Sequence, residues 1–87
     1  MSRQTIFEVS AFEDFRNWQI IDRRTYQKII NIIKRLKRFS DNKVDNGEPL
    51  SGELRGYWSV KIDEEHRLVY KTTSTKIIII ACRYHYS

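Results

Sequence analysis

The sequence predicts an α+β fold in which two helices pack on one face of a small twisted antiparallel sheet, in the order β-α-α-β-β-β. Three patterns lead to this prediction. Apolar residues follow a helical period over 26–36, polar and apolar residues alternate over 57–62, and an unbroken apolar run covers 77–80. A chain of this length forms one domain, residues 1–87, around a single core.

The N-terminal part predicts a strand followed by a helix. Residues 5–9 have strand composition, and Ser10 with Glu13 matches a capping box, in which each side chain accepts a hydrogen bond from the other residue's amide. The aromatic residues of this helix recur at every third position: Phe12, Phe15 and Trp18. Such a stripe is more typical of a core-facing helix than of a ligand platform.

A second helix is predicted to begin after Asp22, whose carboxylate can accept hydrogen bonds from the first helical amides. Its apolar positions form one continuous face: Tyr26, Ile29, Ile30, Ile33 and Leu36. An amphipathic helix of this kind needs an apolar surface to cover. The two helices are therefore predicted to form a hairpin that lies on a sheet.

The C-terminal half predicts that sheet. A polar loop, residues 40–56, precedes three segments of strand composition, 57–62, 67–71 and 77–84. Their short polar connections predict an antiparallel meander. Alternate residues of 57–62 are apolar, so one face can meet the helices while the other carries polar side chains. The run 77–80 is apolar on both faces, which is typical of a central strand.

Composition also bears on the compartment. No apolar run approaches the ~18 residues that cross a bilayer. The segment 1–4 is too polar to begin a signal peptide. The single cysteine, Cys82, has no partner within the chain, which favours a reducing compartment. We therefore expect a cytoplasmic protein with no membrane partner.

Positive charge is concentrated in one segment. The formal net charge is +5, and residues 23–43 hold eight Lys or Arg against Asp41 alone. Four of these cations are close together in the sequence: Lys34, Arg35, Lys37 and Arg38. Such a cluster suits a polyphosphate partner such as RNA or a ribosome. It equally suits a solvated helix end whose cations complement the dipole, and charge alone leaves both interpretations open.

Several kinds of catalytic site lack the residues that they need. No glycine-rich phosphate loop, GxSxG elbow or HExxH helix occurs. A zinc site of His66, Cys82 and His85 is disfavoured, because residues three apart in a strand point to opposite faces. Cys82 is also a poor nucleophile, since an apolar strand disfavours its thiolate. We expect neither a metal nor another cofactor.

A different set of polar residues lies at the ends of the predicted strands: Glu48, Lys61, Arg67, His85 and Tyr86. Cleavage of RNA through its own 2′-hydroxyl needs a base for that hydroxyl, cations around the phosphate oxygens and an acid for the departing 5′-oxygen. Glutamate, lysine with arginine, and histidine can fill these roles. Each residue also has an ordinary interpretation, as a loop residue, a surface ion pair or a solvated terminal side chain.

Five short motifs connect the chain to a known family: 12–15 (FEDF) with Trp18, 48–50 (EPL), 54–59 (LRGYWS), 64–70 (EEHRLVY) and 81–86 (ACRYHY). Together they resemble the YoeB branch of the RelE-type bacterial toxins, along nearly the whole chain. The resemblance implies a fold similar to that of microbial ribonucleases. It also implies a ribosome-dependent endoribonuclease, paired with an antitoxin, that cleaves mRNA in the ribosomal A site.

The resemblance also assigns roles to the polar residues. Glu48 is implied as the general base, Arg67 as the stabiliser of the phosphorane-like charge and His85 as the general acid. Lys61 and Tyr86 are implied to hold phosphate or base. The last strand would then carry His85 and Tyr86 to the polar face of the sheet, beside Arg67.

The chain departs from the family pattern at three places: Asn46-Gly47, Ser51 and Val60-Lys61. Relatives tend to have Lys-Pro, a basic residue and two arginines there, so positive charge is thinner around the implied site. The expected partners are a cognate antitoxin with an acidic segment and the 70S ribosome with mRNA. The sequence leaves open whether the chain forms a homodimer.

Two other functions remain open on the sequence. One is a non-catalytic RNA- or ribosome-binding module that uses the cations within 34–38. The other is one half of a DNA-binding autorepressor complex, in which the partner carries the element that reads DNA.

Overall fold

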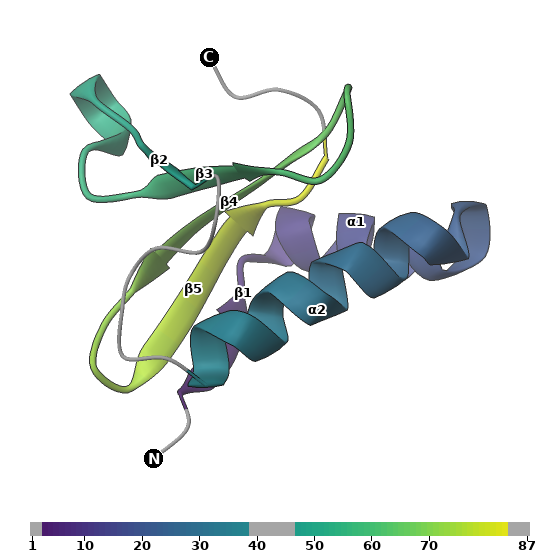
Figure 1. Cartoon of the computed structure of the whole chain (residues 1–87), viewed down its shortest axis with the longest axis horizontal. Helices are drawn as coiled ribbons and strands as arrows, with labels where there is room; N and C mark the ends of the chain where they lie inside the picture. The colour runs from purple at the N-terminus through teal and green to yellow at the C-terminus, as the bar shows by residue number, and fades with distance from the viewer. Residues whose placement is uncertain (1–2, 39–46, 84–87) are drawn as a thin grey trace.

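The computed structural model describes residues 3–38 and 47–83, which form a layer of two helices on one face of a five-stranded sheet (Figure 1). The elements are β1 (Gln4–Phe7), α1 (Val9–Ile21), α2 (Arg23–Arg38), β2 (Glu48–Pro49), the 3-10 helix η1 (Gly52–Leu54), β3 (Trp58–Lys61), β4 (Arg67–Thr72) and β5 (Lys76–Ala81). The predicted α+β class is confirmed. No helix in the described part of the chain is long and apolar enough to span a membrane.

The strand order of the sheet is β1-β5-β4-β3-β2. Strands β3, β4 and β5 form the predicted antiparallel meander, and β2 adds an antiparallel edge. β1 instead pairs parallel to β5, so the sheet is mixed rather than wholly antiparallel. The direction of β1 depends on how the chain returns through the helix layer, and no residue of β1 itself signals it. β5 has a partner on each side, so it is a central strand, as its apolar run predicted.

The start of α1 differs from the predicted capping box. The N-cap residue is Glu8, without a side-chain cap hydrogen bond, and the helix begins at Val9. The amide of Glu8 donates to the carbonyl of Ile79 at 3.0 Å, so sheet pairing continues up to the residue before the helix. Pairing with β5 therefore fixes where α1 begins, and the prediction of Ser10 as N-cap is wrong.

The start of α2 follows the prediction. The amides of Arg24 and Thr25 donate to Oδ1 of Asp22 at 3.0 and 3.5 Å, and the Thr25 hydroxyl donates to Oδ2 at 2.9 Å. The hydrogen bond from the Thr25 side chain is the main reason why the pKa of Asp22 is lowered. At the other end of α2, the buried Arg3 guanidinium donates to the carbonyl of Leu36 at 3.1 Å. Both helix ends thus satisfy backbone groups that the helix leaves open.

The predicted polar loop contains two short elements. In β2, Glu48 pairs with Ser59 and Pro49 with Trp58. Proline cannot donate to a ladder, so an edge strand is the position that suits it. Gly52 and Gly56 have φ values of +68° and +95°, a left-handed conformation that lets the chain turn around η1.

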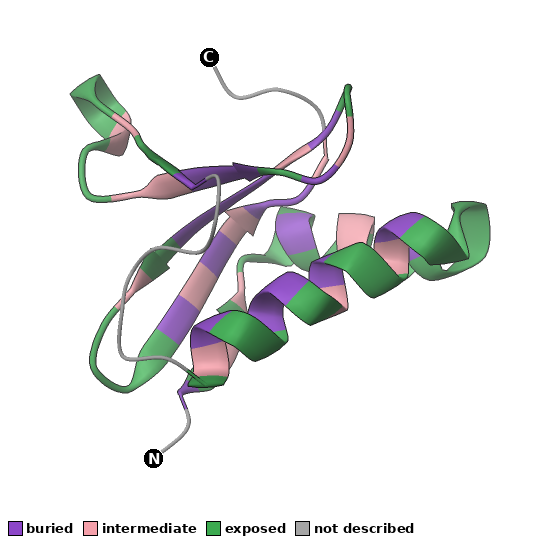
Figure 2. Cartoon of the chain, in the orientation of Figure 1, coloured by how far each residue is buried: buried purple, intermediate pink, exposed green. Residues whose placement is uncertain are grey.

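The core fills the space between the helices and the sheet (Figure 2). Its largest fully buried apolar residues come from α2, β4 and β5: Ile29, Leu36, Leu68, Tyr70, Ile77 and Ile79. The predicted apolar face of α2 is buried at Ile29, Ile33 and Leu36, whereas Tyr26 and Ile30 are half-buried. The buried face of α2 is therefore the apolar face that the helical period predicted.

The aromatic stripe of α1 enters the core only in part. Trp18 is buried, and its Nε1 donates to the carbonyl of Cys82 at 2.9 Å. Phe15 stacks between Phe7 and Tyr26, but Phe12 is 47% exposed. Spacing of three drifts around a helix of 3.6 residues per turn, so Phe12 and Trp18 cannot face the same way.

Candidate functional site

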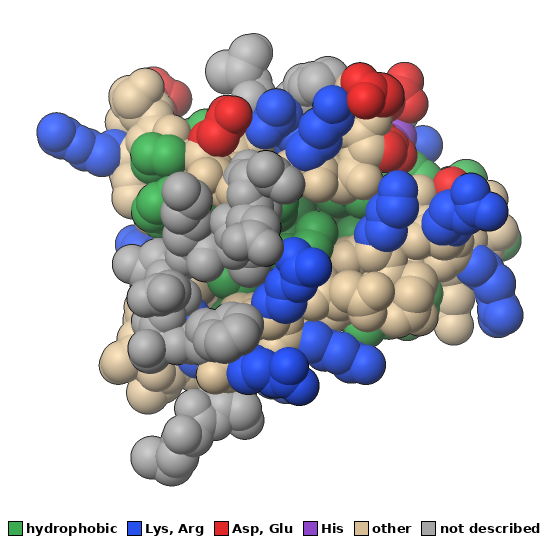
Figure 3. Space-filling view, viewed as in Figure 1, with side chains coloured by type: hydrophobic (Ala, Val, Ile, Leu, Met, Phe, Trp, Pro, Cys, Tyr) green, Lys and Arg blue, Asp and Glu red, His purple; other side chains and the backbone are tan. Residues whose placement is uncertain are grey.

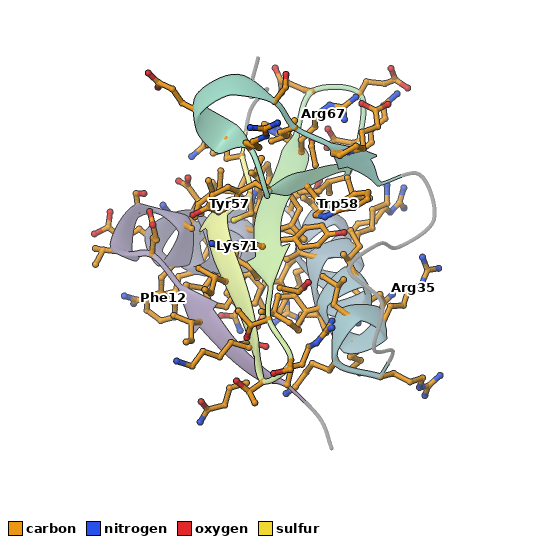
Figure 4. All side chains as sticks on the ribbon, turned by 90° about the vertical axis from the view of Figure 1, so that its left-hand side faces the viewer. Phe12, Arg35, Tyr57, Trp58, Arg67 and Lys71 are labelled. Atoms are coloured by element: carbon orange, nitrogen blue, oxygen red, sulfur yellow. The ribbon has the colours of Figure 1, made fainter. Side chains whose placement is uncertain are left out.

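The two faces of β3 and β4 carry different residues. In the antiparallel register, Val60 lies opposite Leu68 and faces the helices, while Ser59 lies opposite Val69 and Lys61 opposite Arg67 on the other face. Figure 4 shows Arg67, Tyr57 and Lys71 along the sheet on the side away from the helices. We call this side the uncovered face, and it carries alternate residues of the two strands and the residue before β3: Tyr57, Ser59, Lys61, Arg67, Val69 and Lys71.

Arg67 is the centre of a small polar cluster on the uncovered face. Its side chain is 24% exposed, and its Nη1 donates to Oγ of Ser59 at 3.2 Å. The same Nη1 lies 3.8 Å from Oε2 of Glu48. The three residues come from β2, β3 and β4, and the pairing of Glu48 with Ser59 brings the β2 carboxylate to this place.

Arg67 can exchange the Glu48 carboxylate for another anion. A distance of 3.8 Å is at the long end for an ion pair, and the Glu48 side chain is 68% exposed. A guanidinium has five N–H donors in a planar fork, and Ser59 engages the Nη1 end. A phosphate could therefore replace Glu48 beside Arg67 and leave the carboxylate free to accept a proton.

Lys61 has a different partner. Although it lies opposite Arg67 in the register, its Nζ bonds to Oε1 of Glu64 at 3.1 Å, in the turn that follows β3. The side chains of this pair are 47% and 95% exposed, so their attraction is weakened by water. The structure thus places Lys61 near the cluster but engaged outside it.

Two predicted site residues, His85 and Tyr86, lie outside the described residues. β5 ends at Ala81, before the predicted end of that strand, and the described part of the chain ends at Arg83. The roles assigned to His85 and Tyr86 stay predictions. The roles assigned to Glu48, Arg67 and Lys61 stay predictions as well, although the first two lie side by side.

The predicted RNA- or ribosome-binding cations occupy the last turns of α2. Lys34, Arg35 and Arg38 are exposed and Lys37 is half-buried. Lys and Arg side chains gather over α2 in the space-filling view (Figure 3). They also lie at the helix C-terminus, where cations complement the dipole, so both interpretations of this charge persist.

Cys82 is a core residue. It is fully buried, and its Sγ lies 3.4 Å from the carbonyl of Ala11. Burial raises the pKa of the thiol to about 12, with a smaller contribution from Asp14. A thiol of this pKa is almost entirely protonated at neutral pH and cannot serve as a nucleophile. Within residues 3–38 and 47–83, no three His, Cys, Asp or Glu side chains come together as a metal site would require.

Sequence reasoning missed Ser59. The residue is almost completely buried, at 1% exposure, and its hydroxyl is the hydrogen-bond partner of Arg67. The signal was present in the alternation of 57–62, since Ser59 falls on the same face as Lys61. A serine is common in polar loops and strands, so the pattern alone gave no reason to select it.

Comparison with known proteins identifies the family. Residues 7–86 match the family model described as "YoeB-like toxin of bacterial type II toxin-antitoxin system". The chain is 42% identical to toxin RelK of Mycobacterium tuberculosis over 84 residues, which cover 97% of this chain and 99% of RelK.

Two solved structures have the same fold. The YoeB dimer from Staphylococcus aureus has a TM-score of 0.87 at 34% identity, covering 99% of this chain and 100% of that one. The YoeB-YefM complex from the same organism has a TM-score of 0.85 at 33% identity, with the same coverage. These matches confirm the family that the EEHRLVY and CRYHY motifs indicated. The chain therefore belongs to the YoeB-like toxins of bacterial type II toxin–antitoxin systems.

Proposed function

We propose that this toxin is an endoribonuclease that cleaves mRNA in the ribosomal A site without a metal ion. The observation that carries the proposal is the cluster of Glu48, Ser59 and Arg67 on the uncovered face of the sheet. A carboxylate beside a guanidinium supplies a proton acceptor and an anion-binding group at one place. Membership of the toxin family supports the same assignment.

The proposed reaction uses the substrate's own nucleophile. Glu48 takes the proton of the 2′-hydroxyl, and the 2′-oxygen attacks the adjacent phosphorus. Arg67, assisted by Lys61, stabilises the charge on the non-bridging oxygens. The bond to the 5′-oxygen breaks as that oxygen takes a proton from His85. The products are a 2′,3′-cyclic phosphate and a free 5′-hydroxyl, so atoms and charges balance.

Ser59 gives Arg67 a fixed support during this exchange. Because its hydroxyl holds Nη1 at 3.2 Å, the guanidinium keeps one hydrogen bond when Glu48 turns to the 2′-hydroxyl. The short β2 also suits the proposal, since it places Glu48 on the backbone of an edge strand with an exposed side chain. Groups held on strands are more accurately positioned than groups on loops.

We propose further that a cognate antitoxin neutralises this toxin. The S. aureus relative is known as a complex of YoeB with YefM, and another structure of the same relative is a dimer. The cations of α2 would attract an acidic antitoxin segment that orders on binding. A homodimer of the free toxin is proposed on the same likeness.

Cleavage of a translated message tests the catalytic roles. Primer extension on mRNA translated in vitro should show cuts within codons for the wild type. Glu48→Gln and His85→Ala should each lower the cleavage rate by about 10²- to 10⁴-fold, the usual contribution of a general base or acid. Both variants should still sediment with ribosomes.

The matched control for Glu48 is Glu53→Gln. Glu53 is an exposed carboxylate in η1, close in sequence to Glu48, and has no assigned role. The Glu53→Gln variant should cleave mRNA at the wild-type rate. Unchanged cleavage by both Glu48→Gln and His85→Ala would refute the proposed mechanism.

A non-catalytic RNA- or ribosome-binding module remains the second candidate, because Lys34, Arg35 and Arg38 are exposed on α2. That function predicts that Lys34→Glu with Arg38→Glu abolishes translation inhibition, while Glu48→Gln leaves it intact. The two proposals thus give opposite results with the same variants.

A further inference from the structure

A pocket of about 210 Å³ lies between α2 and the end of β3. Its lining consists of three cations, one amide and two isoleucines: Lys28, Arg35, Lys61, Asn31, Ile32 and Ile62. We propose that this α2–β3 pocket binds a backbone phosphate of single-stranded RNA that leaves the Glu48–Arg67 cluster. The inference rests on the proposed ribonuclease function, but its test measures binding and not cleavage.

The cations of the pocket are available to a ligand. In the part of the chain that the structure describes, neither Lys28 nor Arg35 forms a close ion pair, although the charge of Lys28 contributes to the lowered pKa of Asp63. Lys61 is paired with Glu64, but both side chains of that pair face water. An exposed pair of this kind contributes little, so a phosphate can displace Glu64 from Lys61.

The remaining lining also suits a nucleotide. Oδ1 of Asn31 accepts a hydrogen bond from Gln27 at 3.1 Å, so the amide nitrogen of Asn31 remains a donor for a phosphate oxygen. Ile32 and Ile62 are at most 9% exposed and form an apolar floor. A ribose or base can cover such a floor while its phosphate meets the cations.

Lys61 connects the pocket to the candidate site. It lies opposite Arg67 in the β3–β4 register, yet it also lines the pocket together with residues of α2. β2 pairs only with Trp58 and Ser59, so it does not extend along the edge of β3 to Lys61. An RNA strand can therefore pass from Arg67 over this end of β3 and reach α2. Figure 3 shows cations beside a hydrophobic strip between α2 and the sheet, as this path requires.

RNA fits these observations better than an acidic peptide does. The pocket includes Lys61, which lies opposite Arg67 in the β3–β4 register, so phosphates of one RNA strand would occupy both places. Lys61 is shared by the two places, whereas an acidic peptide gives no reason for a connection to Arg67. The acidic peptide becomes an outcome of the test.

Binding of an uncleavable RNA tests the inference. The probe is a short 2′-O-methyl oligonucleotide, which lacks the proposed nucleophile, measured by fluorescence anisotropy over a series of salt concentrations. Lys28→Gln with Arg35→Gln should weaken binding about tenfold. The slope of log K against log salt should become shallower by about 0.7, because one phosphate of the single strand is no longer neutralised by the protein.

The matched control removes the same charges elsewhere. Arg24→Gln with Lys76→Gln also replaces one arginine and one lysine, both exposed and both outside the pocket. Each double variant lowers the formal net charge of +5 by the same amount. The control should bind the oligonucleotide within about twofold of the wild type, because the charges that it loses lie outside the pocket. The general attraction between protein and RNA falls equally in the two double variants, so a larger loss in the pocket variant comes from the pocket itself.

Uncharged methylphosphonate linkages in the oligonucleotide show which phosphate contacts the pocket. Replacing one phosphate at a time by a methylphosphonate should weaken wild-type binding most at a single position. At that position the pocket variant should be insensitive to the replacement, since the partner of that phosphate is already gone. Additive losses at every position would overturn the inference.

The other outcomes are equally decisive. The inference fails if the pocket variant and the control lose the same affinity, or if the wild type does not bind the oligonucleotide at low salt. It also fails if a polyglutamate peptide loses affinity for the pocket variant while RNA does not, because the pocket is then an acidic-peptide site. If the wild type cuts no translated message but the methylphosphonate result holds, the proposed function fails and the phosphate site stands.

Discussion

The covered and uncovered faces of β3 and β4 are made from alternate residues of the same two strands. Leu68 and Tyr70 face the helices and have no exposed surface, whereas their neighbours Arg67 and Lys71 lie on the uncovered face. Burial of apolar side chains stabilises the fold on the first face. On the second face, an arginine is held by one buried hydroxyl and one exposed carboxylate.

The two faces show that residues for stability and residues for the proposed chemistry are adjacent in the same strand, because neighbouring side chains point to opposite faces of the sheet. A substitution on the covered face should change the free energy of unfolding, and a substitution on the uncovered face should change activity. The exceptions are Ser59 and Val69, which lie opposite each other on the uncovered face and yet are buried. The following predictions test this separation, from the largest effect to the smallest.

Leu68 and Arg67 give the most direct contrast, because they are adjacent residues of β4. Leu68→Ala should lower the free energy of unfolding by about 2–5 kcal/mol through reduced burial and a cavity. Arg67→Ala should leave stability nearly unchanged but lower mRNA cleavage by about 10²- to 10³-fold, as for the removal of other transition-state donors.

Urea denaturation and primer extension measure these two effects. The separation breaks down if Arg67→Ala unfolds as easily as Leu68→Ala. It also breaks down if Leu68→Ala, assayed well below its melting temperature, loses as much activity as Arg67→Ala.

Ser59→Ala should lower cleavage by about tenfold, because Arg67 loses the hydrogen bond that orients it. The effect acts through Arg67, so Ser59→Ala should cause no further loss in an Arg67→Ala background. Single-turnover cleavage rates of the four proteins in this cycle provide the measurement. Ser74→Ala, an exposed serine in the turn between β4 and β5, is the control. Equal losses in both backgrounds would mean that Ser59 acts independently of Arg67.

Asp22→Ala should lower the melting temperature by a few degrees, because α2 loses its N-terminal cap and α2 covers the sheet. The pKa of Asp22 is lowered from 3.8 in the folded protein, so its stabilisation is present above that value and is lost as pH falls through the lower folded pKa.

The difference in melting temperature between the wild type and Asp22→Ala should therefore shrink as the pH falls below 3.8. Asp22→Asn keeps a capping oxygen and should show a smaller loss at pH 7, which should also shrink as the wild-type carboxylate is protonated. A wild-type advantage that persists undiminished at low pH would contradict the role of the carboxylate.

Cys82 should show almost no reaction with a thiol reagent while the protein is folded. With the pKa of its thiol raised to about 12 by burial, it should not react with iodoacetamide in the folded protein at pH 8. In denaturant it should react at the rate of an ordinary thiol, and mass spectrometry distinguishes the two states. Equal labelling of folded and unfolded protein would place Cys82 outside the covered core.

Local patterns in the sequence were sufficient for the elements that have a strong period. The helical repeat predicted the face of α2, and alternation predicted that Val60 and Ile62 enter the core. The cap at Asp22 was also predictable, because it involves neighbours within one turn. Such features depend on residues that are close in sequence.

Features that depend on distant residues could not be predicted in this way. The capping box at Ser10 is a correct local pattern, but pairing of Glu8 with Ile79 starts the helix earlier. β2 and η1 were hidden in a polar segment, because β2 exists only through its pairing with β3. The motifs pointed to Glu48 and Arg67 individually, and they did not reveal Ser59 between them.

The sequence by itself determined the α+β class, the meander of β3 to β5 and the toxin family, because periodicity and motifs are properties of the chain alone. Only the tertiary structure decided that β1 runs parallel to β5, that β2 brings Glu48 to Arg67, and that Lys61 borders the α2–β3 pocket. These contacts join segments far apart in the chain. Their geometry depends on how the two layers pack, which no local pattern encodes.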